Sequence, residues 1–346
     1  MNPAQTQGEQ AALRAPASVD GPAEVHAVNP DATAQANGST THGGYTQRSY
    51  AYSNAGNITS FEGAALAYNA AAHKHAVTHI GGVQKYWYDA NGNATRRITP
   101  WGLDITMAYD AENRLTQVSN GVTASYTYDG DGNRVKAVVN GTTSVYVGAY
   151  FEVTGGITRT YYYAGNVRVA ERYSNTLYFL LTDHLGSTAT TTDASGNRVT
   201  ELRYYPYGDS ARYNPSGQIT TFNFTGQRKD SESGLLFYNA RWHDPVVGRF
   251  LAADTIVLQP QDLQNLNRYS YCGSNPLRFV DPSGHAGVDF WGGGGGAGAG
   301  VGLVVALMQG AQQTMAQVQG AVYQYGPVAQ PKLPEKIEAR EAGVIP

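Results

Sequence analysis

The chain has 346 residues and a formal net charge of −3, so it carries no excess of positive charge that would favour binding to nucleic acid. Only 15% of its residues are charged, whereas Gly (41) and Tyr (25) are frequent, which is typical of tight turns and aromatic strands rather than of helical bundles. Its single cysteine, Cys272, excludes an intrachain disulfide framework. The longest apolar stretch, 297–308, is short and rich in glycine, so we expect no membrane span.

Residues 1–44 are rich in Ala, Gln, Pro, Asn and Thr and show no apolar period, so we expect a disordered leader. A basic segment followed by an apolar run is missing from its start, and we therefore expect no signal peptide in this chain.

A tyrosine-aspartate pair recurs between residues 45 and 226. It occurs at Tyr88-Asp89, Tyr109-Asp110 and Tyr128-Asp129, each time before a turn that contains Asn and, in two of the three, Gly. The interval is about 20 residues, which indicates an array of one supersecondary unit.

Each unit is expected to be an antiparallel β-hairpin. Ala124–Tyr128 alternates like a strand, Asp-Gly and Gly-Asn steps supply the turn, and Arg134–Val139 forms the second strand. One hairpin cannot bury its own apolar face, so neighbouring hairpins are expected to stack into a curved sheet. The sequence therefore predicts an all-β fold.

Less regular strands are expected downstream of these repeats. An aromatic strand that ends in a Pro/Gly turn is expected at Glu201–Gly208. The other expected strands are Thr143–Phe151, Ile157–Tyr163, Asn166–Tyr173 and Thr176–Leu181.

Residues 227–285 form a distinct block that contains three aspartates in suggestive places. Asp244 and Asp281 precede prolines, and Asp254 lies in an Ala-Ala-Asp-Thr step. Asp281-Pro282-Ser283-Gly284 fits a type I turn, with Asp first, Pro second and Gly fourth. The residues alone leave two interpretations open: this block caps a β structure, or it also cuts the chain.

The motifs of this chain resemble those of the RHS/YD-repeat family, in particular the RHS repeat-associated core. The resemblance spans about 45–285 and is carried by the tyrosine-aspartate repeats together with several longer motifs. These are Leu181-Thr182-Asp183-His184-Leu185-Gly186-Ser187, Tyr204-Tyr205-Pro206-Tyr207-Gly208, Phe224-Thr225-Gly226-Gln227, Gly234–Pro245, Gly248-Arg249-Phe250-Leu251, Leu266–Tyr271, Asn275-Pro276-Leu277 and Asp281–His285.

The resemblance implies a hollow β-shell, or YD-shell, built from hairpins (45–226) and closed by the core (227–285). It also implies that the core cuts the chain after its closing motif by an aspartyl-protease-like mechanism. Asp254 and Asp281 are then the candidate acids, Arg249 is a candidate for positioning charge, and His285–Ala286 is the scissile bond. Two close carboxyl groups suit this chemistry because one can donate a proton while the other activates water. Many such cores carry leucine where this chain has His285.

The tail, 286–346, begins rich in glycine and becomes partly helical in character. The resemblance implies that the shell encloses this tail, that the protein is secreted or lies at the cell surface, and that an immunity protein or a secretion machinery is its partner. The alternative is a non-catalytic β-repeat module at the cell surface that binds protein or, through its tyrosines, carbohydrate.

No cofactor or metal is expected. His73, His75 and His79 suit zinc by residue type, yet no cysteine or carboxylate completes the set with a convincing spacing. An exposed polar loop is the favoured interpretation of this segment.

Overall fold

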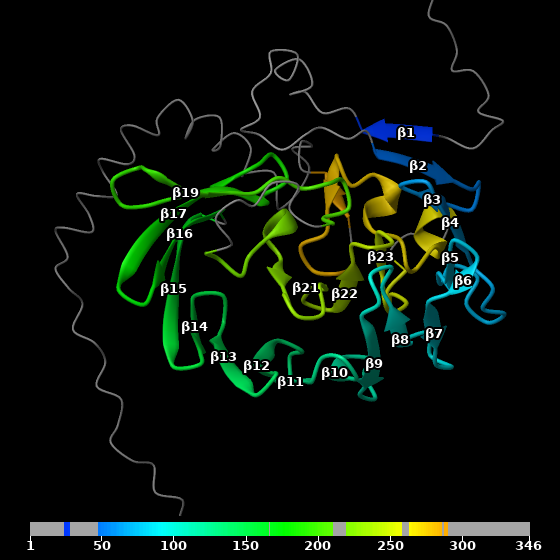
Figure 1. Ribbon diagram of the computed structural model, residues 1–346, viewed down its shortest axis with the longest axis horizontal. Coiled ribbons are helices and arrows are strands. Elements are labelled where there is room, and N and C mark those ends of the chain that lie inside the picture. Colours follow the sequence, from blue (N-terminus) through cyan, green and yellow to red (C-terminus); the bar gives the residue numbers. More distant parts are fainter. Residues whose placement is uncertain are drawn as a thin grey trace, which may run out of the picture.

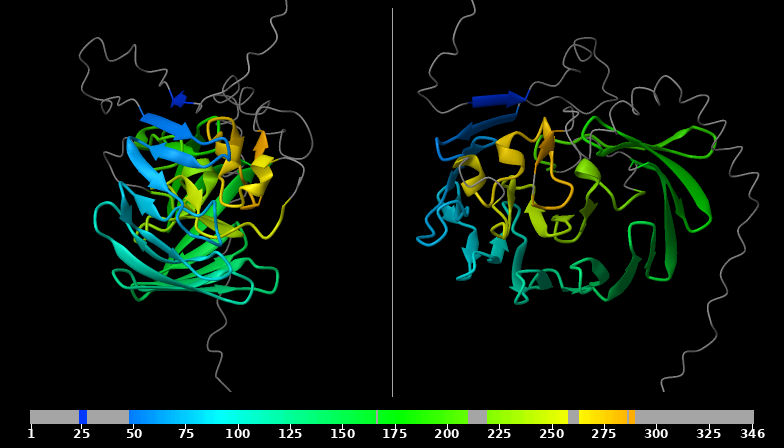
Figure 2. Two further views of the ribbon diagram at one scale, coloured as in Figure 1. Left: turned by 90° about the vertical axis from the view of Figure 1, so that its right-hand side faces the viewer. Right: turned by 180° about the vertical axis from the view of Figure 1, so that it is seen from behind.

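The computed structural model describes residues 24–27, 48–165, 167–209, 219–257, 263–285 and 287–289. Within them the chain is all-β, and a long antiparallel wall of strands curves around a small inner sheet (Figure 1). Seen from behind, the wall surrounds the inner sheet on several sides (Figure 2). The all-β prediction is confirmed.

The strands of each sheet of the wall follow one another in sequence order, and from β7 to β19 each pair of neighbours is antiparallel with a short connection. The first sheet contains β1 (Glu24–Ala27), β2 (Arg48–Tyr52), β3 (Ile58–Phe61), β4 (Ala64–Ala67), β5 (His79–Ile80) and β6 (Val83–Gln84). The second sheet contains β7 (Tyr86–Tyr88), β8 (Ala94–Ile98), β9 (Asp104–Tyr109), β10 (Leu115–Ser119), β11 (Ala124–Tyr128), β12 (Arg134–Val139), β13 (Thr142–Val147), β14 (Phe151–Thr154), β15 (Ile157–Ala164), β16 (Val167–Tyr173), β17 (Thr176–Thr182), β18 (Thr188–Thr192) and β19 (Arg198–Glu201).

The inner part, which we call the core segment, contains a four-stranded sheet and several short elements. The sheet contains β20 (Arg228–Lys229), β21 (Leu236–Tyr238), β22 (Arg241–Asp244) and β23 (Arg249–Phe250). The short elements are the 3₁₀ helices η2 (Phe224–Gly226), η3 (Leu263–Leu266) and η4 (Cys272–Ser274) and the paired strands β24 (Phe279–Val280) and β25 (Val288–Asp289).

Strands β11 and β12 match the predicted hairpin residue for residue. The predicted strand Thr143–Phe151 is divided into β13 and β14, because Gly148 takes a positive φ of 56° and turns the chain. The prediction of a strand at Glu201–Gly208 is wrong for most of its length: only Glu201 belongs to a strand, as the last residue of β19. In the predicted leader, Glu24–Ala27 forms β1 by pairing with the edge of β2, and the remainder of 1–44 lies outside the described residues.

The aspartate of each repeat caps the turn that follows it. Its Oδ1 accepts the backbone N–H of the residue four positions on, at 2.8–2.9 Å in each turn. The aspartates are Asp89, Asp110, Asp129, Asp183 and Asp193. One side chain thus fixes the turn geometry of each hairpin.

The tyrosine of the repeat connects one unit to the preceding one. The hydroxyl groups of Tyr68, Tyr88 and Tyr128 each donate to a backbone carbonyl 10 to 13 residues earlier, at 2.8 Å. These rings are half-buried and pack against the hydrophobic core, while their hydroxyl groups remain hydrogen-bonded. Spacing, turn and inter-repeat contact therefore follow from the same pair of residues.

Aromatic contacts join the core segment to the wall. Tyr126 of β11 packs on Trp242 with ring centroids 4.9 Å apart. The guanidinium of Arg134 lies 4.3 Å from the ring centroid of Phe237. No helix in the described part of the chain is long and apolar enough to cross a membrane.

Candidate functional site

The closing motif Asp281-Pro282-Ser283-Gly284 forms a turn directly after β24. Asp281 Oδ1 accepts the backbone N–H groups of Gly284 at 2.7 Å and His285 at 3.1 Å. Gly284 has a φ of +82°, and a Cβ there would collide with the carbonyl oxygen of Tyr238. The motif therefore has a structural reason, as the turn interpretation predicts.

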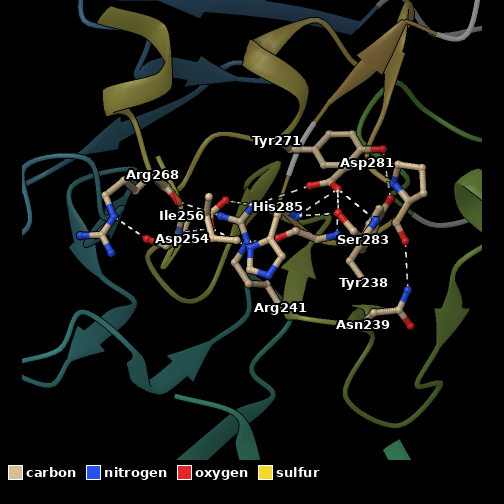
Figure 3. Close-up of polar contacts among 12 residues, drawn as sticks. Tyr238, Asn239, Arg241, Asp254, Ile256, Arg268, Tyr271, Asp281, Ser283 and His285 are labelled. Carbon is tan, nitrogen blue, oxygen red and sulfur yellow. Dashed lines mark hydrogen bonds and ion pairs between the residues drawn. The ribbon is translucent and has the colours of Figure 1, made fainter. Parts of the chain in front are cut away.

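The turn between β21 and β22 holds this closing turn in place. The backbone N–H of Ala240 donates to the Ser283 carbonyl at 3.1 Å, and the Asn239 side chain donates to the Pro282 carbonyl at 3.0 Å (Figure 3). The end of the core segment is thus fixed against the start of β22.

Arg241, the first residue of β22, joins the two candidate acids. Its Nη2 lies 2.9 Å from Asp254 Oδ2 and 3.6 Å from Asp281 Oδ2 (Figure 3). Its Nε donates to the carbonyl of Gly284, and its Nη1 donates to the carbonyl of Arg268 at 2.8 Å. One guanidinium therefore contacts both carboxylates and the closing turn.

Asp254 follows β23 in the chain, and its backbone N–H and carbonyl groups are both hydrogen-bonded to Arg268. Its N–H donates to the Arg268 carbonyl at 2.9 Å, and its carbonyl accepts Nε of Arg268 at 2.5 Å. Asp254 Oδ1 accepts the N–H of Ile256 at 2.9 Å and lies 2.7 Å from His285 Nδ1. His285 and Arg241 thus contact different oxygens of the Asp254 carboxylate, Oδ1 and Oδ2 (Figure 3).

The charged groups of the site are withdrawn from solvent. Asp254 is 5% exposed, Asp281 2% and Arg241 6%. Burial lowers the pKa of Arg241 to about 10, and the carboxylates of Asp254 and Asp281 limit this fall. Coulombic interactions among these groups are therefore stronger than they would be at the surface.

The structure brings three of the predicted site residues together, Asp254, Asp281 and His285, and places Arg249 elsewhere. The Arg249 guanidinium donates to Asn57 Oδ1 at 2.8 Å and to the His75 carbonyl at 3.1 Å, so its charge serves the junction between the core segment and the wall. Ala286 lies outside the described residues.

Arg241 is the site residue that the sequence reasoning missed. It stands within the Asn-Ala-Arg-Trp-His-Asp-Pro motif, yet its partners are distant in sequence: Asp254 and the closing turn. Arg241 lies two residues after Asn239, whose side chain donates to the Pro282 carbonyl of the closing turn. This neighbourhood indicates a role for Arg241 at the closing turn only once the fold is known.

Two carboxyl groups on one guanidinium, in a site closed to solvent, can exchange protons with a water molecule and with an amide nitrogen. The adjacent chain is the closing turn itself, since Arg241 and Asp281 both bind it. The arrangement is therefore chemically suited to act on the peptide that follows this turn.

The histidines of the segment 73–79 each have a contact of their own. His75 Nδ1 lies 2.8 Å from Asn57 Oδ1, and His73 Nε2 lies 3.1 Å from the Asp89 carbonyl. In the described part of the chain no three His, Cys, Asp or Glu side chains are grouped to hold a metal ion.

Some of the tyrosines that suggested carbohydrate binding lie inside the fold, whereas Tyr150 is 65% and Tyr162 37% exposed. Tyr86, Tyr126, Tyr161 and Tyr207 are each less than 5% exposed. Rings in this position pack the interior and cannot stack on a sugar at the surface.

A family model described as the teneurin YD-shell matches residues 147–277. Among curated proteins, the tRNA nuclease WapA of Bacillus subtilis (strain 168) is 28% identical over 214 residues, which are 57% of this chain and 9% of that protein. The toxin subunit YenC2 of Yersinia entomophaga is 33% identical over 102 residues, which are 28% of this chain and 10% of that protein. This chain thus spans about a tenth of the length of these relatives.

Among solved structures, the crystal structure of TcdB2-TccC3 has a TM-score of 0.56 at 22% identity and covers 69% of this chain and 14% of that chain. The structure of the same pair without its hypervariable C-terminal region also has a TM-score of 0.56, at 20% identity, and covers 69% of this chain and 13% of that one. At these identities the likeness concerns the fold: the curved wall of hairpins and the segment inside it.

Proposed function

The chain belongs to the RHS/YD-repeat proteins, and from this premise we propose that it is part of a toxin-delivery protein that cuts itself between His285 and Ala286. The observation that carries this proposal is the meeting of Asp254 and Asp281 on the guanidinium of Arg241, directly beside the closing turn.

In the proposed reaction one aspartate accepts a proton from a water molecule while the other donates a proton to the leaving amide nitrogen. The water oxygen bonds to the carbonyl carbon of His285, and the bond to the nitrogen of Ala286 breaks. The products are a carboxylate on His285 and an amine on Ala286. Arg241 supplies the positive charge that holds both carboxylates in place.

The test is the intact mass of the purified full-length chain. We expect the unchanged chain to yield two fragments, 1–285 and 286–346, and we expect Asp254→Asn and Asp281→Asn to remain whole, because each removes one of the two carboxyl groups. Each step that loses its proton donor or acceptor should slow by about 100-fold or more.

Asp131→Asn is the matched control, since Asp131 lies exposed in the turn between β11 and β12, outside the core segment, and its replacement should leave cutting unchanged. Circular dichroism shows whether each variant keeps its strands. A folded unchanged chain that stays whole, with the same mass profile as Asp254→Asn, overturns the proposal.

The tail, 286–346, is the segment that this cut would release, and we propose that the shell encloses it. The support is the curvature of the wall around the inner sheet (Figure 1) and the toxin subunits among the similar proteins. Secretion or display at the cell surface, and an immunity or secretion partner, belong to the same proposal.

A further inference from the structure

His285 makes a contact that neither the turn nor the proposed cut requires. Its Nδ1 lies 2.7 Å from Asp254 Oδ1, and its side chain is 28% exposed. The contact spans 31 residues of sequence and joins the last residue before the proposed scissile bond to one of the two acids. The residue that is to be cut therefore binds the group that is to cut it.

The imidazole completes a ring of donors around Asp254. Arg241 contacts Oδ2 at 2.9 Å, and the Ile256 N–H donates to Oδ1 at 2.9 Å. A carboxylate has about four lone-pair positions, so a third donor leaves little room for a water molecule to approach. The protonation state of His285 decides how firmly this third donor is held.

The charged and titratable groups around His285 come from several elements. Asp254 follows β23, Arg241 opens β22, and Asp281 accepts the His285 backbone N–H at 3.1 Å. Arg268 contacts the backbone carbonyl of Asp254, and Cys272 of η4 lies near Arg241. Of these, only the Asp254 carboxylate is in direct contact with the imidazole ring.

We propose that protonated His285 holds Asp254 in an inactive ion pair, so that self-cleavage is slow while the imidazole is charged and faster once it is neutral. This inference rests on the proposed function. A positive charge beside a carboxylate makes it a weaker base, and the pair must open before water can reach the oxygen. A neutral imidazole binds less firmly and exchanges its tautomer, which frees the carboxylate.

The change in rate should fall where histidines titrate, between about pH 5 and 8. The full-length chain is collected in denaturant, refolded between pH 5.5 and 8.0, and followed by intact mass. We expect its cleavage rate to rise by about 10-fold over this range, because an imidazole of ordinary pKa, about 6.5, is about one-tenth neutral at the lower end and almost fully neutral at the upper end. His285→Leu should cut at a rate that is nearly independent of pH and should exceed the unchanged chain most at pH 5.5.

His285→Asn separates charge from hydrogen bonding, because its amide offers an N–H donor at a similar place without a titratable group. We expect a pH-independent rate between those of the other two chains. A His285→Leu chain that keeps the pH profile of the unchanged chain overturns the proposed inhibition of Asp254 by protonated His285.

A second measurement is independent of cleavage. In Asp281→Asn, which should stay whole, nuclear magnetic resonance follows the signals of the His285 ring nitrogens at pH 5.5. Adding Asp254→Asn should change their chemical shifts, because Nδ1 loses the carboxylate that it contacts. Unchanged signals overturn the ion pair, whereas absence of cleavage from every chain at every pH overturns the proposed function itself.

Discussion

His243 lies with its imidazole ring among three aromatic rings of the core segment. The ring centroids of Tyr271, Tyr238 and Phe250 lie 4.6, 5.6 and 5.7 Å away. Among the described residues neither ring nitrogen has a hydrogen-bond partner. Burial lowers the pKa of His243 to about 3, although the charge of Asp244 opposes this shift.

This residue predicts that the fold is sensitive to acid. The unfolded chain binds a proton at His243 near its ordinary pKa of 6.5, whereas the folded chain binds it only near 3. The contribution of neutral His243 to the free energy of unfolding is therefore complete above pH 6.5. It falls as the pH drops toward 3, by at most about 1.4 kcal/mol per pH unit. Urea unfolding at a series of pH values measures the effect.

His243→Leu replaces the ring by an apolar side chain of similar volume and removes the titrating group. We expect a flatter dependence of the unfolding free energy on pH between 6.5 and 4 than in the unchanged chain. The same slope in both chains would show that His243 is not the cause.

At the residue scale, the resemblance predicted Asp254 and Asp281 but not the guanidinium that joins them. Arg241 and Arg249 both belong to the motifs on which the resemblance rests, and both are buried. Which of them meets the acids depends on how β22 and the closing turn pack, since Arg249 instead reaches Asn57. This packing is tertiary and leaves no local signal in the sequence.

At the scale of elements, β8 of the wall is joined to β22 by a fully buried ion pair. Arg97 and Asp244 are both 0% exposed, and Arg97 Nη2 donates to Asp244 Oδ1 at 2.7 Å. The Tyr86 hydroxyl also donates to Asp244, at 2.7 Å, and Arg97 Nη1 donates to the Ser233 carbonyl at 2.8 Å. Asp244 thus begins the turn at Pro245 and also binds the wall through Arg97 and Tyr86.

Removal of one partner of this pair should be costly. Arg97→Met leaves the Asp244 carboxylate buried without its counter-charge, and we expect a loss of about 3–5 kcal/mol in the free energy of unfolding. The double variant Arg97→Met/Asp244→Leu should lose less than the sum of the two single changes. Urea unfolding of the four chains closes the cycle.

Arg96→Met serves as the matched control on the same strand. Its ion pair with Asp104 is at the surface, with Arg96 43% exposed, and should contribute less than about 1 kcal/mol. Equal losses for Arg96→Met and Arg97→Met would contradict the role given to burial.

The elements that the sequence predicted best are the hairpins with an Asp-capped turn. Asp129, Gly132 and Asn133 fix the turn between β11 and β12 through contacts within a few residues, so local reasoning suffices. The division at Gly148 was missed because the apolar residues on both sides read as one continuous strand.

At the scale of the whole molecule, the core segment contacts the wall at places far apart in sequence. Asn267 donates to the Gly56 carbonyl at 2.9 Å in the turn between β2 and β3. Trp242 packs on Tyr126 near the middle of the wall, and Arg228 forms an ion pair with Glu152 of β14. The repeats therefore do not depend on their neighbours alone.

Arrays of repeats tend to unfold in pieces, because each unit contacts only its neighbours. Here the shared core segment should couple the units, and we expect one cooperative thermal transition in which the calorimetric and van't Hoff enthalpies agree. Arg249→Met should weaken this coupling, since it removes the hydrogen bonds to Asn57 and His75 and leaves β2–β6 with fewer contacts to the core segment. A separate transition at lower temperature is expected for that variant in differential scanning calorimetry. Two transitions in the unchanged chain would mean that wall and core segment fold independently, because coupling through the core segment requires them to melt together.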